Sequence, residues 1–430
     1  MINTTEVEQI SLSDPSALYN SVSEVKMVRG EGIHLFDSDG RDYIDCASAT
    51  FNLSLGYGHP AIINAIKEQS EKLIHVTSAF QTDSINQLAS KLVELSPQRL
   101  TSVHLKVSSG SVANEGAIKM AQRATGKREI MSLFRSHHGQ TMVTANISGN
   151  AFRKENFAHS LPGSLVVPDP YCYRCFYGKD PNSCSFECVS KLDDFLEFAS
   201  TGNVAAIIVE PISGNGGNIV PPDGYFQRLR KFCDENNIKM IFDEIQTGIG
   251  RTGHMFAAEY FDVEPDAMTV AKGLGGSGAQ VAGILASDEL SGLPSSEHSF
   301  TYGSNVLAAS AAVATLDIVS QPEFLKNVTL TGDFILNRLR QMQTKYKFIG
   351  DVRGLGLMIG FEINNENGSP NPTLTNWMAD MAMKHGLILR TSRYGHGNVL
   401  KIRPPLILTL TEAEILCNRL ENLFQDVVGK

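Results

Sequence analysis

Short apolar runs that alternate with helical stretches constrain the fold of this chain more than any other feature. Each run is apolar throughout and bounded by polar or glycine-containing segments, which is typical of a strand buried on both faces of a parallel sheet. A segment between two of the runs has apolar residues at helical spacing, as βαβ units require. The alternation predicts a central α/β domain. The five runs are 103–107, 130–134, 204–209, 240–242 and 268–271.

Both ends of the chain have a different pattern. Residues 33–45 read as two extended runs joined by an Asp-Gly dipeptide, which favours a tight antiparallel turn. Near the C-terminus, residues 357–363 and 399–402 read as strands. Thr411 and Glu414 have the spacing of a capping box that begins a final helix. These patterns predict a small antiparallel element at the start and an α+β domain at the end.

Composition excludes several classes of protein. The chain has 430 residues, with 37 Lys and Arg against 46 Asp and Glu, and its net charge of -9 argues against nucleic acid as a partner. No apolar run reaches the roughly 18 residues of a membrane span, and the first residues lack the features of a signal peptide. Seven cysteines are an odd number, so reduced thiols are expected. We therefore expect a cytoplasmic enzyme without a membrane partner.

A turn of small residues follows the first apolar run. Residues 108–111 read Ser-Ser-Gly-Ser and lead into a helical stretch. A strand, a tight turn and a helix start bring free backbone N–H groups and the positive end of the helix to one point, which suits a phosphate. The turn matches neither a Walker loop nor a dinucleotide-binding fingerprint, so an ordinary turn is the alternative.

Three charged residues end three of the apolar runs: Glu210, Asp243 and Lys272. Because the carboxyl ends of strands in an open α/β sheet form the ligand crevice, we expect these side chains to converge there. An ion pair without a ligand is the alternative interpretation. Glycines follow each of the three residues and would let a ligand approach the backbone closely, which favours a binding site.

Ordered motifs then indicate a family. The segments SSGSVANEGAIKMAQRATG, IIVEPISGNGGNIVPPDGY, IFDEIQTGIGRTG, TYGSN and VRGLGLMIGFEI resemble the class III (ω-type) aminotransferases, which are pyridoxal-phosphate enzymes of fold type I. The resemblance extends from about residue 30 to the C-terminus. It implies an α/β large domain at 60–320 with a mostly parallel central sheet. It also implies a smaller α+β domain built from both chain ends, 1–59 and 321–430.

The resemblance assigns the catalytic residues. Lys272 matches the lysine that holds pyridoxal 5'-phosphate as a Schiff base and, once released by the substrate amine, moves the proton of a 1,3-shift. Asp243 matches the aspartate beside the pyridine nitrogen, where a negative charge stabilises the protonated ring. The implied reaction transfers an amino group from an amine or amino acid to a 2-oxo acid.

The resemblance also assigns other contacts to the cofactor. Gly110 and Ser111 match the phosphate-binding turn, and Gln246 matches a residue near the phenolic oxygen. Thr301 matches a threonine that reaches the phosphate from the neighbouring subunit, which implies a homodimer with shared active sites. His137 stands in the place of the tyrosine whose ring commonly covers the cofactor in this family.

Candidate substrate residues are Glu210 and Arg403. Arg403 alternates with Lys401 along a predicted strand, so both side chains face the same side. Some relatives have their carboxylate-binding arginine at the position of Lys401; we take Arg403 as the candidate here. Glu210 resembles a family glutamate that can pair with such an arginine or release it.

An amino-acid racemase on the same fold is the alternative function, because it would keep every cofactor contact and reprotonate Cα from the opposite face. An imidazole can titrate near neutral pH, so His137 is a candidate second acid/base group, and a stacked neutral ring is the other interpretation. Asn215 occupies a loop where an acidic residue would suit a racemase, and an amide carries no proton at neutral pH. A non-catalytic descendant is disfavoured by the retention of Lys272, Asp243 and the phosphate turn.

A cysteine-rich segment at 172–188 allows two interpretations. Its four cysteines could form a closed zinc or iron–sulfur site, or belong to a surface insertion with reduced thiols. We expect the second and predict no metal. The four residues are Cys172, Cys175, Cys184 and Cys188. We expect the other three cysteines to lie in the core, and Arg251 to stabilise the loop after the Asp243 strand.

Overall fold

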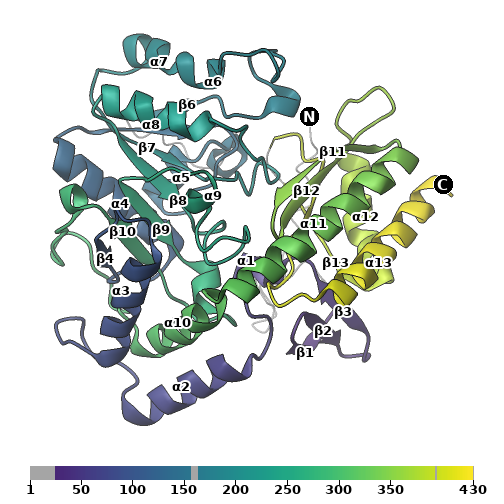
Figure 1. Cartoon of the computed structure of the whole chain (residues 1–430), viewed down its shortest axis with the longest axis horizontal. Coiled ribbons are helices and arrows are strands. Elements are labelled where there is room, and N and C mark those ends of the chain that lie inside the picture. Colours follow the sequence, from purple (N-terminus) through teal and green to yellow (C-terminus); the bar gives the residue numbers. More distant parts are fainter. Residues whose placement is uncertain (1–24, 156–162, 393–394, 430) are drawn as a thin grey trace, which may run out of the picture.

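The computed structural model describes residues 25–155, 163–392 and 395–429. Its larger part is built on a seven-stranded sheet with helices on both faces (Figure 1). In order across the sheet, the strands are β4 (Ser102–His104), β10 (Gly283–Ala286), β9 (Ala267–Val270), β8 (Lys239–Asp243), β7 (Val204–Val209), β5 (Glu129–Leu133) and β6 (Ser164–Val167).

The sheet is parallel in its centre and antiparallel at one side. Strands β9, β8, β7, β5 and β6 pair in parallel, whereas β10 is antiparallel to both β9 and β4. We expected the run 103–107 to form a parallel strand, and this prediction is wrong because β4 pairs antiparallel with β10. Strands β10 and β6 were not predicted. Pairing direction depends on a strand distant in sequence, so a local apolar pattern does not encode it.

The apolar runs are continuous because the sheet is buried on both faces. In β7, Ile207 and Val209 point into one core, which α8 (Tyr225–Glu235) and α10 (Val306–Val319) cover. The alternate residues Ala206 and Ile208 point into a second core under α4 (Gly110–Thr125). Side chains alternate along a strand, so a strand between two helical layers needs apolar residues throughout.

The smaller part combines both ends of the described chain. In Figure 1 the N-terminal strands, in purple, lie beside the C-terminal elements in yellow and green, and one hydrophobic core contains residues from both. One sheet is β1 (Met27–Glu31), β2 (His34–Asp37), β3 (Asp42–Asp45) and β13 (Leu387–Ile388). The other is β11 (Ile349–Leu355), β12 (Met358–Ile363), β15 (Val399–Ile402) and β14 (Arg390–Thr391). The boundaries at 59 and 320 stay a prediction.

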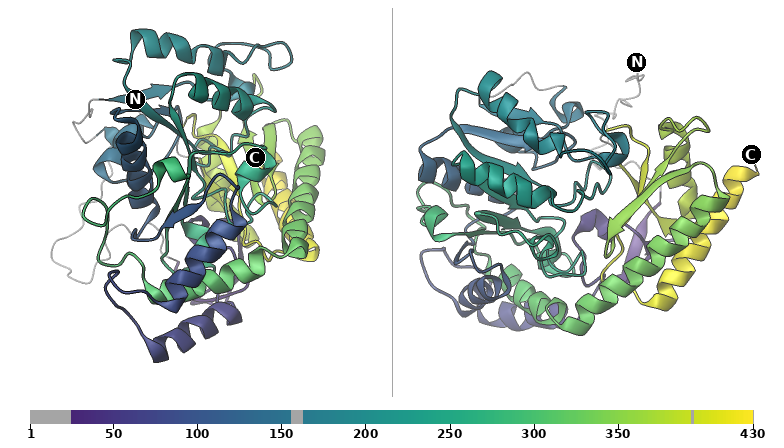
Figure 2. Two further views of the ribbon diagram at one scale, coloured as in Figure 1. Left: turned by 60° about the vertical axis from the view of Figure 1, so that its left-hand side comes forward. Right: turned by 45° about the horizontal axis from the view of Figure 1, so that its top comes forward.

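Helices cover these sheets and connect the two parts. The long α11 (Pro322–Lys345) runs from the larger part along the smaller one (Figure 2). It is joined in the smaller part by α12 (Pro372–Ala382) and α13 (Leu410–Val428). The larger part also contains α2 (Pro60–Lys72), α3 (Asp83–Leu95), α5 (Met142–Ile147), α6 (Glu187–Ser190), α7 (Leu192–Phe198) and α9 (Ala257–Tyr260), and the short α1 (Ser48–Phe51) lies between the two parts (Figure 1).

The capping box of α13 lies two residues earlier than predicted. Thr409 is the N-cap, its hydroxyl accepts from the backbone N–H of Glu412, and the Glu412 carboxylate accepts from the Thr409 N–H. The sequence Thr-Leu-Thr-Glu-Ala-Glu contains the motif twice, at 409–412 and 411–414. The structure uses the first because Ala413, Leu416 and the apolar residues that follow are already on the buried face of the helix.

Gly332 allows α11 to pack closely against the turn between β11 and β12. A Cβ added at Gly332 would lie 2.2 Å from the carbonyl oxygen of Gly356, whose own φ of +52° favours glycine. We expect Gly332→Ala to lower the free energy of unfolding by about 1–3 kcal/mol, because the helix must move away. Thermal unfolding of the cofactor-free protein measures this. Gly429→Ala, whose added Cβ would meet its nearest atom at 3.7 Å, is the control. An unchanged midpoint for Gly332→Ala would contradict the packing argument.

The structure also bears on the cysteines, Arg251 and the membrane. Cys46, Cys233 and Cys417 are buried, as expected, and no cysteine forms a disulfide. The guanidinium of buried Arg251 donates to the carbonyls of Leu357 and Pro404, so it joins its loop to the smaller part. The part of the chain that the structure describes has no group of three or more His, Cys, Asp or Glu arranged to hold a metal. None of its helices has the length and apolar composition to cross a bilayer. The residues examined for a signal peptide lie outside the described ones.

Candidate active site

A cleft opens at the carboxyl ends of the parallel strands. It has a volume of about 280 Å³, and residues that follow β4, β5, β8 and β9 line it. Six of the predicted site residues are among them: Gly110, Ser111, His137, Asp243, Gln246 and Lys272. The topology thus brings together side chains that are as far as 162 positions apart in the sequence, from 110 to 272.

The start of α4 forms one wall of the cleft. Ser109 is the N-cap in an extended conformation, and the backbone N–H groups of the first turn have no partner within the helix. A Cβ at Gly110 would come within 2.7 Å of the Ile245 side chain, so a larger residue would require that side chain to shift. The Ser111 hydroxyl accepts from the N–H of Gln140 at 3.1 Å. These groups and the helix dipole suit a phosphate.

Asp243 is a buried carboxylate held by three donors. One oxygen accepts from Asn114 Nδ2 and His138 Nδ1, each at 2.8 Å, and the other accepts from the Ile245 N–H at 3.2 Å. Burial alone would raise the pKa of Asp243, but His138, Lys272 and Asn114 outweigh it, so the pKa is lowered. The cleft therefore contains a fixed negative charge, which suits a protonated pyridine ring.

Sequence reasoning missed two of the residues that hold Asp243. Asn114 lies one turn into α4 and also donates to the His138 carbonyl at 2.7 Å, while its own oxygen accepts from the Thr269 hydroxyl at 2.6 Å. His138 is buried beside His137 in a His-His-Gly sequence. A polar residue in the apolar face of α4 was the available signal, because buried amides need partners.

Lys272 lies shortly after β9 and lines the same cleft as Asp243. Its φ of +43° is unusual for a residue with a side chain, which marks a strained position at the end of the strand. Burial lowers the pKa of Lys272 to about 8, and the carboxylates of Asp243 and Glu210 oppose that shift. An ordinary lysine has a pKa near 10.4, so this amine is far more often neutral and nucleophilic at pH 8.

His137 lines the cleft, and the structure bears on its two interpretations. Burial, and then the nearby charge of Lys272, lower the pKa of His137 to about 3. The imidazole is therefore neutral at pH 7, which corresponds to the alternative of an uncharged ring.

Glu210 and Arg403 lie one contact behind the cleft. Glu210 accepts from the backbone N–H groups of His137 at 2.8 Å and Gly214 at 2.9 Å, and burial raises its pKa. Arg403 is 1% exposed and donates to Gln246 Oε1, which lines the cleft, and to the Gly214 carbonyl, both at 2.5 Å. Among the described residues the two do not form an ion pair with each other.

Arg403 is a buried cation held by neutral acceptors. Its third acceptor is Asn218 Oδ1, its Nε has no hydrogen-bond partner among the described residues, and its guanidinium lies 4.0 Å from the Phe51 ring centroid. Burial and the repulsion of Arg251 lower the pKa of Arg403 to about 9. An incoming carboxylate would supply the missing negative charge. Lys401 is buried and its amine lies 5.5 Å from the same ring centroid.

Thr301 is the predicted cofactor residue that lies apart from the cleft of its own chain. It is exposed in a turn before α10 and is not among the residues that line the cleft. Its predicted contact requires a neighbouring subunit and stays a prediction.

A lysine with a lowered pKa, a buried aspartate and a helix N-terminus at the carboxyl edge of a mostly parallel sheet define a pyridoxal-phosphate enzyme of fold type I. The model of the family "Aminotransferase class-III" matches residues 18–424. The chain therefore belongs to the class III aminotransferases, and its cofactor is pyridoxal 5'-phosphate.

Individual relatives agree with this family and differ in their named activities. A leucine/methionine racemase of Thermococcus litoralis is 35% identical over 98% of this chain and 95% of its own length. An acetylornithine aminotransferase of Methanothermobacter thermautotrophicus is 33% identical over 94% of each chain. An amine transaminase structure from an uncultivated Pseudomonas species, in its pyridoxal-phosphate-bound form, has a TM-score of 0.88 at 29% identity. That match covers 96% of this chain and 98% of the other.

Proposed function

We propose that this enzyme transfers an amino group from an amine or amino acid to a 2-oxo acid, with Lys272 and Asp243 as its catalytic residues. The observation that carries the proposal is the position of Lys272, whose lowered pKa makes its amine a nucleophile, opposite the buried charge of Asp243. The free N–H groups at the start of α4 lie in the same cleft, at Gly110 and Ser111.

The residues of the cleft fit the parts of the cofactor. Lys272 Nζ would hold its aldehyde carbon covalently, the N–H groups of Gly110 and Ser111 would bind its phosphate, and Asp243 would face its ring nitrogen. When bound, pyridoxal phosphate supplies an electron sink for negative charge at the carbon that bears the amino group. His137 would cover the ring as a neutral imidazole, and the amide of Gln246 would lie near the phenolic oxygen.

Proton transfer falls to Lys272. With the cofactor bound, the Nζ amine of Lys272 would accept the proton from the substrate carbon that bears the amino group and later give that proton back. A pKa of about 8 suits this task, because an amine with a pKa near the working pH can both accept and donate a proton. Asp243 keeps its negative charge throughout, since its three donors stabilise the ionised form.

Arg403 would bind the substrate carboxylate. The guanidinium is buried without a carboxylate partner among the described residues, so binding an anion would offset the cost of burying its charge. Glu210 would tune that site from behind His137. We further propose a cytoplasmic homodimer in which Thr301 reaches the neighbouring cleft; its exposed turn outside the cleft of its own chain supports this.

The visible absorption of the cofactor-loaded protein tests the proposed reaction. A panel of amines and amino acids is added one at a time without any oxo acid. A donor is expected to remove the absorption of the lysine-bound cofactor and to leave one equivalent of carbonyl product per active site. Absence of carbonyl product with every donor would contradict amino transfer.

Racemisation is the second candidate, favoured by the similarity to the leucine/methionine racemase. The low pKa of His137 weighs against it, because a neutral imidazole at pH 7 lacks the acidic proton of the imidazolium and is a poor acid toward the opposite face of the substrate. The same panel distinguishes the two reactions. A racemase would leave the absorption in place while the optical purity of one amino acid decays.

The pKa of Lys272 leads to a pH prediction. Only the neutral amine attacks an aldehyde, so the rate at which the cofactor-free protein captures pyridoxal phosphate should rise with pH and level off above about 8. Stopped-flow absorption measures this rate over a range of about two pH units on either side of that pKa, from about pH 6 to about pH 10. Nα-acetyl-lysine is the control, and its rate should keep rising toward pH 10. A protein rate that also keeps rising would contradict the lowered pKa.

A further inference from the structure

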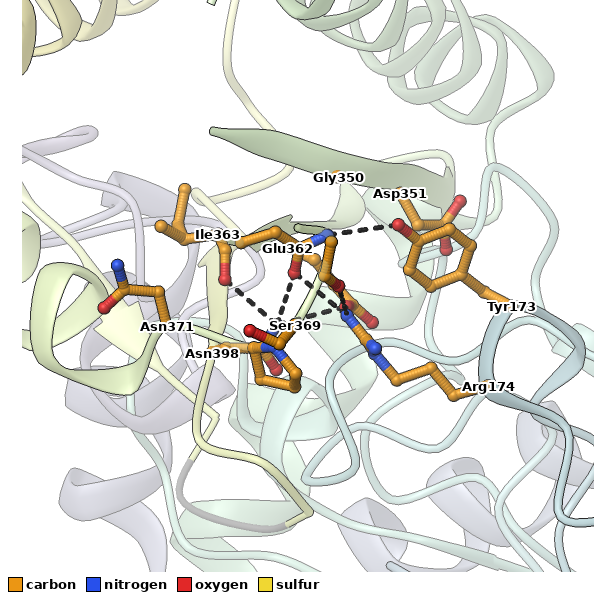
Figure 3. A network of polar contacts seen from close by, with 12 residues as sticks. Tyr173, Arg174, Gly350, Asp351, Glu362, Ile363, Ser369, Asn371 and Asn398 are labelled. Carbon is orange, nitrogen blue, oxygen red and sulfur yellow. Dashed lines mark hydrogen bonds and ion pairs between the residues drawn. The ribbon is translucent and has the colours of Figure 1, made fainter. Parts of the chain in front are cut away.

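A buried carboxylate of the smaller part receives side chains from both parts of the molecule. Glu362 of β12 is fully buried and pairs with Arg174 at 2.8 Å and with Arg353 at 3.3 Å. Asn398, directly before β15, donates to it at 3.0 Å. Figure 3 shows Arg174 reaching from the cysteine-rich segment of the larger part toward Glu362 and Asn398. Arg174 also donates to Asn364 Oδ1 at 2.9 Å.

One of these partners holds a loop of the larger part. The Nε of Arg353 donates to the carbonyl of Gly217 at 3.1 Å, and its Nη1 is shared between Glu362 and Asp351. The loop 213–219 follows β7 and closes on itself through paired backbone hydrogen bonds between Ser213 and Ile219. Arg353 thus reaches from the smaller part to a loop beside the cleft.

That loop supplies two of the three acceptors of Arg403. The guanidinium of Arg403 donates to the Gly214 carbonyl and to Asn218 Oδ1, and the Asn218 amide donates in turn to the Ile359 carbonyl of β12 at 2.7 Å. The second connection is strand β15. Its first residue, Val399, pairs with Glu362 in the sheet, and Arg403 directly follows its last residue. Two routes of direct contacts, through the loop and through β15, therefore join Glu362 to Arg403.

We propose that Glu362 is a positioning residue that orients Arg403 for the substrate carboxylate. The inference rests on the proposed role of Arg403. A neutral residue at 362 would leave two buried or half-buried cations without their common carboxylate. Arg353 would then pair with Asp351 alone and lose its hydrogen bond to Gly217. The loop that supplies acceptors to Arg403 would therefore open more often.

The first test uses the cofactor-free protein and needs no catalysis. In Glu362→Gln we expect hydrogen–deuterium exchange of the backbone amides in 213–219 to become about 2- to 30-fold faster. This is the size of effect expected when a mutation weakens a network that holds a distant loop closed. Glu421→Gln is the matched control. Glu421 also pairs with two cations, Arg338 and Lys345, but it lies on α13 and makes none of the contacts that lead to the loop.

The second test compares two amino-donor substrates with the cofactor-loaded enzyme. One is the amino acid with the highest kcat/KM in the donor panel, and the other is its analogue with methyl in place of the carboxylate. For Glu362→Gln we expect kcat/KM of the amino acid to fall about 2- to 30-fold, mainly through KM, while that of the analogue stays within about twofold. A merely structural role would lower both donors together.

The outcomes separate the two proposals. If the unmodified enzyme does not prefer the amino acid over its methyl analogue, the role of Arg403 fails. If it does, and Glu362→Gln changes neither loop exchange nor the preference, the positioning role alone is overturned. Should Glu362→Gln fail to fold, Arg353→Lys replaces it, because a lysine keeps the positive charge beside Asp351 but lacks the Nε donor that holds the Gly217 carbonyl. The same increases in exchange and in KM are expected, and their absence would overturn the proposal.

Discussion

Lys272→Ala is expected to lower kcat about 10²- to 10⁴-fold, the range for removing a positioned acid/base group. The variant loses the amine that would both hold the cofactor and move the proton, and among the described residues no other lysine lines the cleft. Cofactor should still bind through the start of α4 and Asp243, but without a covalent bond. Borohydride reduction followed by mass spectrometry measures that bond, because it fixes one cofactor per chain in the unmodified protein.

The control for Lys272→Ala is Lys239→Ala. Lys239 begins β8 at the opposite end of the sheet and pairs with Glu289, so its loss should leave the rate and the reducible bond unchanged. Added methylamine is expected to restore part of the rate in Lys272→Ala, because a small amine can replace the missing base. Covalent labelling of Lys272→Ala at another lysine would contradict the assignment.

Asp243→Asn is expected to lower kcat about 10²- to 10³-fold, the typical loss when one electrostatic stabiliser of a reacting centre is removed. Both oxygens of Asp243 accept hydrogen bonds, so an amide nitrogen in either position would face a donor from Ile245, Asn114 or His138. The variant thus loses the charge opposite the ring nitrogen and disturbs the network around it. Steady-state kinetics with the best donor and cofactor affinity by absorption titration measure both effects.

Asp266→Asn is the matched control for Asp243→Asn. Asp266 is an equally buried carboxylate that pairs with Arg99 and Arg230, but it precedes β9 whereas Lys272 follows it. Its loss should lower stability and leave kcat unchanged at temperatures where the protein is folded. A normal rate in Asp243→Asn would contradict the proposed role of its charge.

The elements that sequence predicts well are those with a complete local signal. The run 204–209 is β7 to the residue, and the helical segment expected between two of the runs is α8 at Tyr225–Glu235. In both, burial pattern and backbone geometry repeat with a fixed period along a few consecutive residues. The convergence of Asp243 and Lys272 could also be anticipated, since Asp243 ends one buried parallel strand and Lys272 lies two residues after the end of the next.

Other features depend on residues far apart in the sequence and were missed or wrong. The capping box of α13 had two equivalent candidates, and the packing of the helix selected Thr409. The antiparallel pairing of β10 has no local signature. Asn114 and His138 reach Asp243 only because α4 and the turn after β5 meet above the same strand end.

By itself, the sequence determined the family, the α/β centre and the chemical types of the cleft, because strand ends and motif order are local properties of a chain. Tertiary structure decided how these groups behave. Burial lowers the pKa of His137 and Lys272, neutral acceptors hold Arg403, and Glu362 joins side chains from both parts. A charge buried among distant partners responds to all of them at once, and no local pattern records which partners the fold will supply.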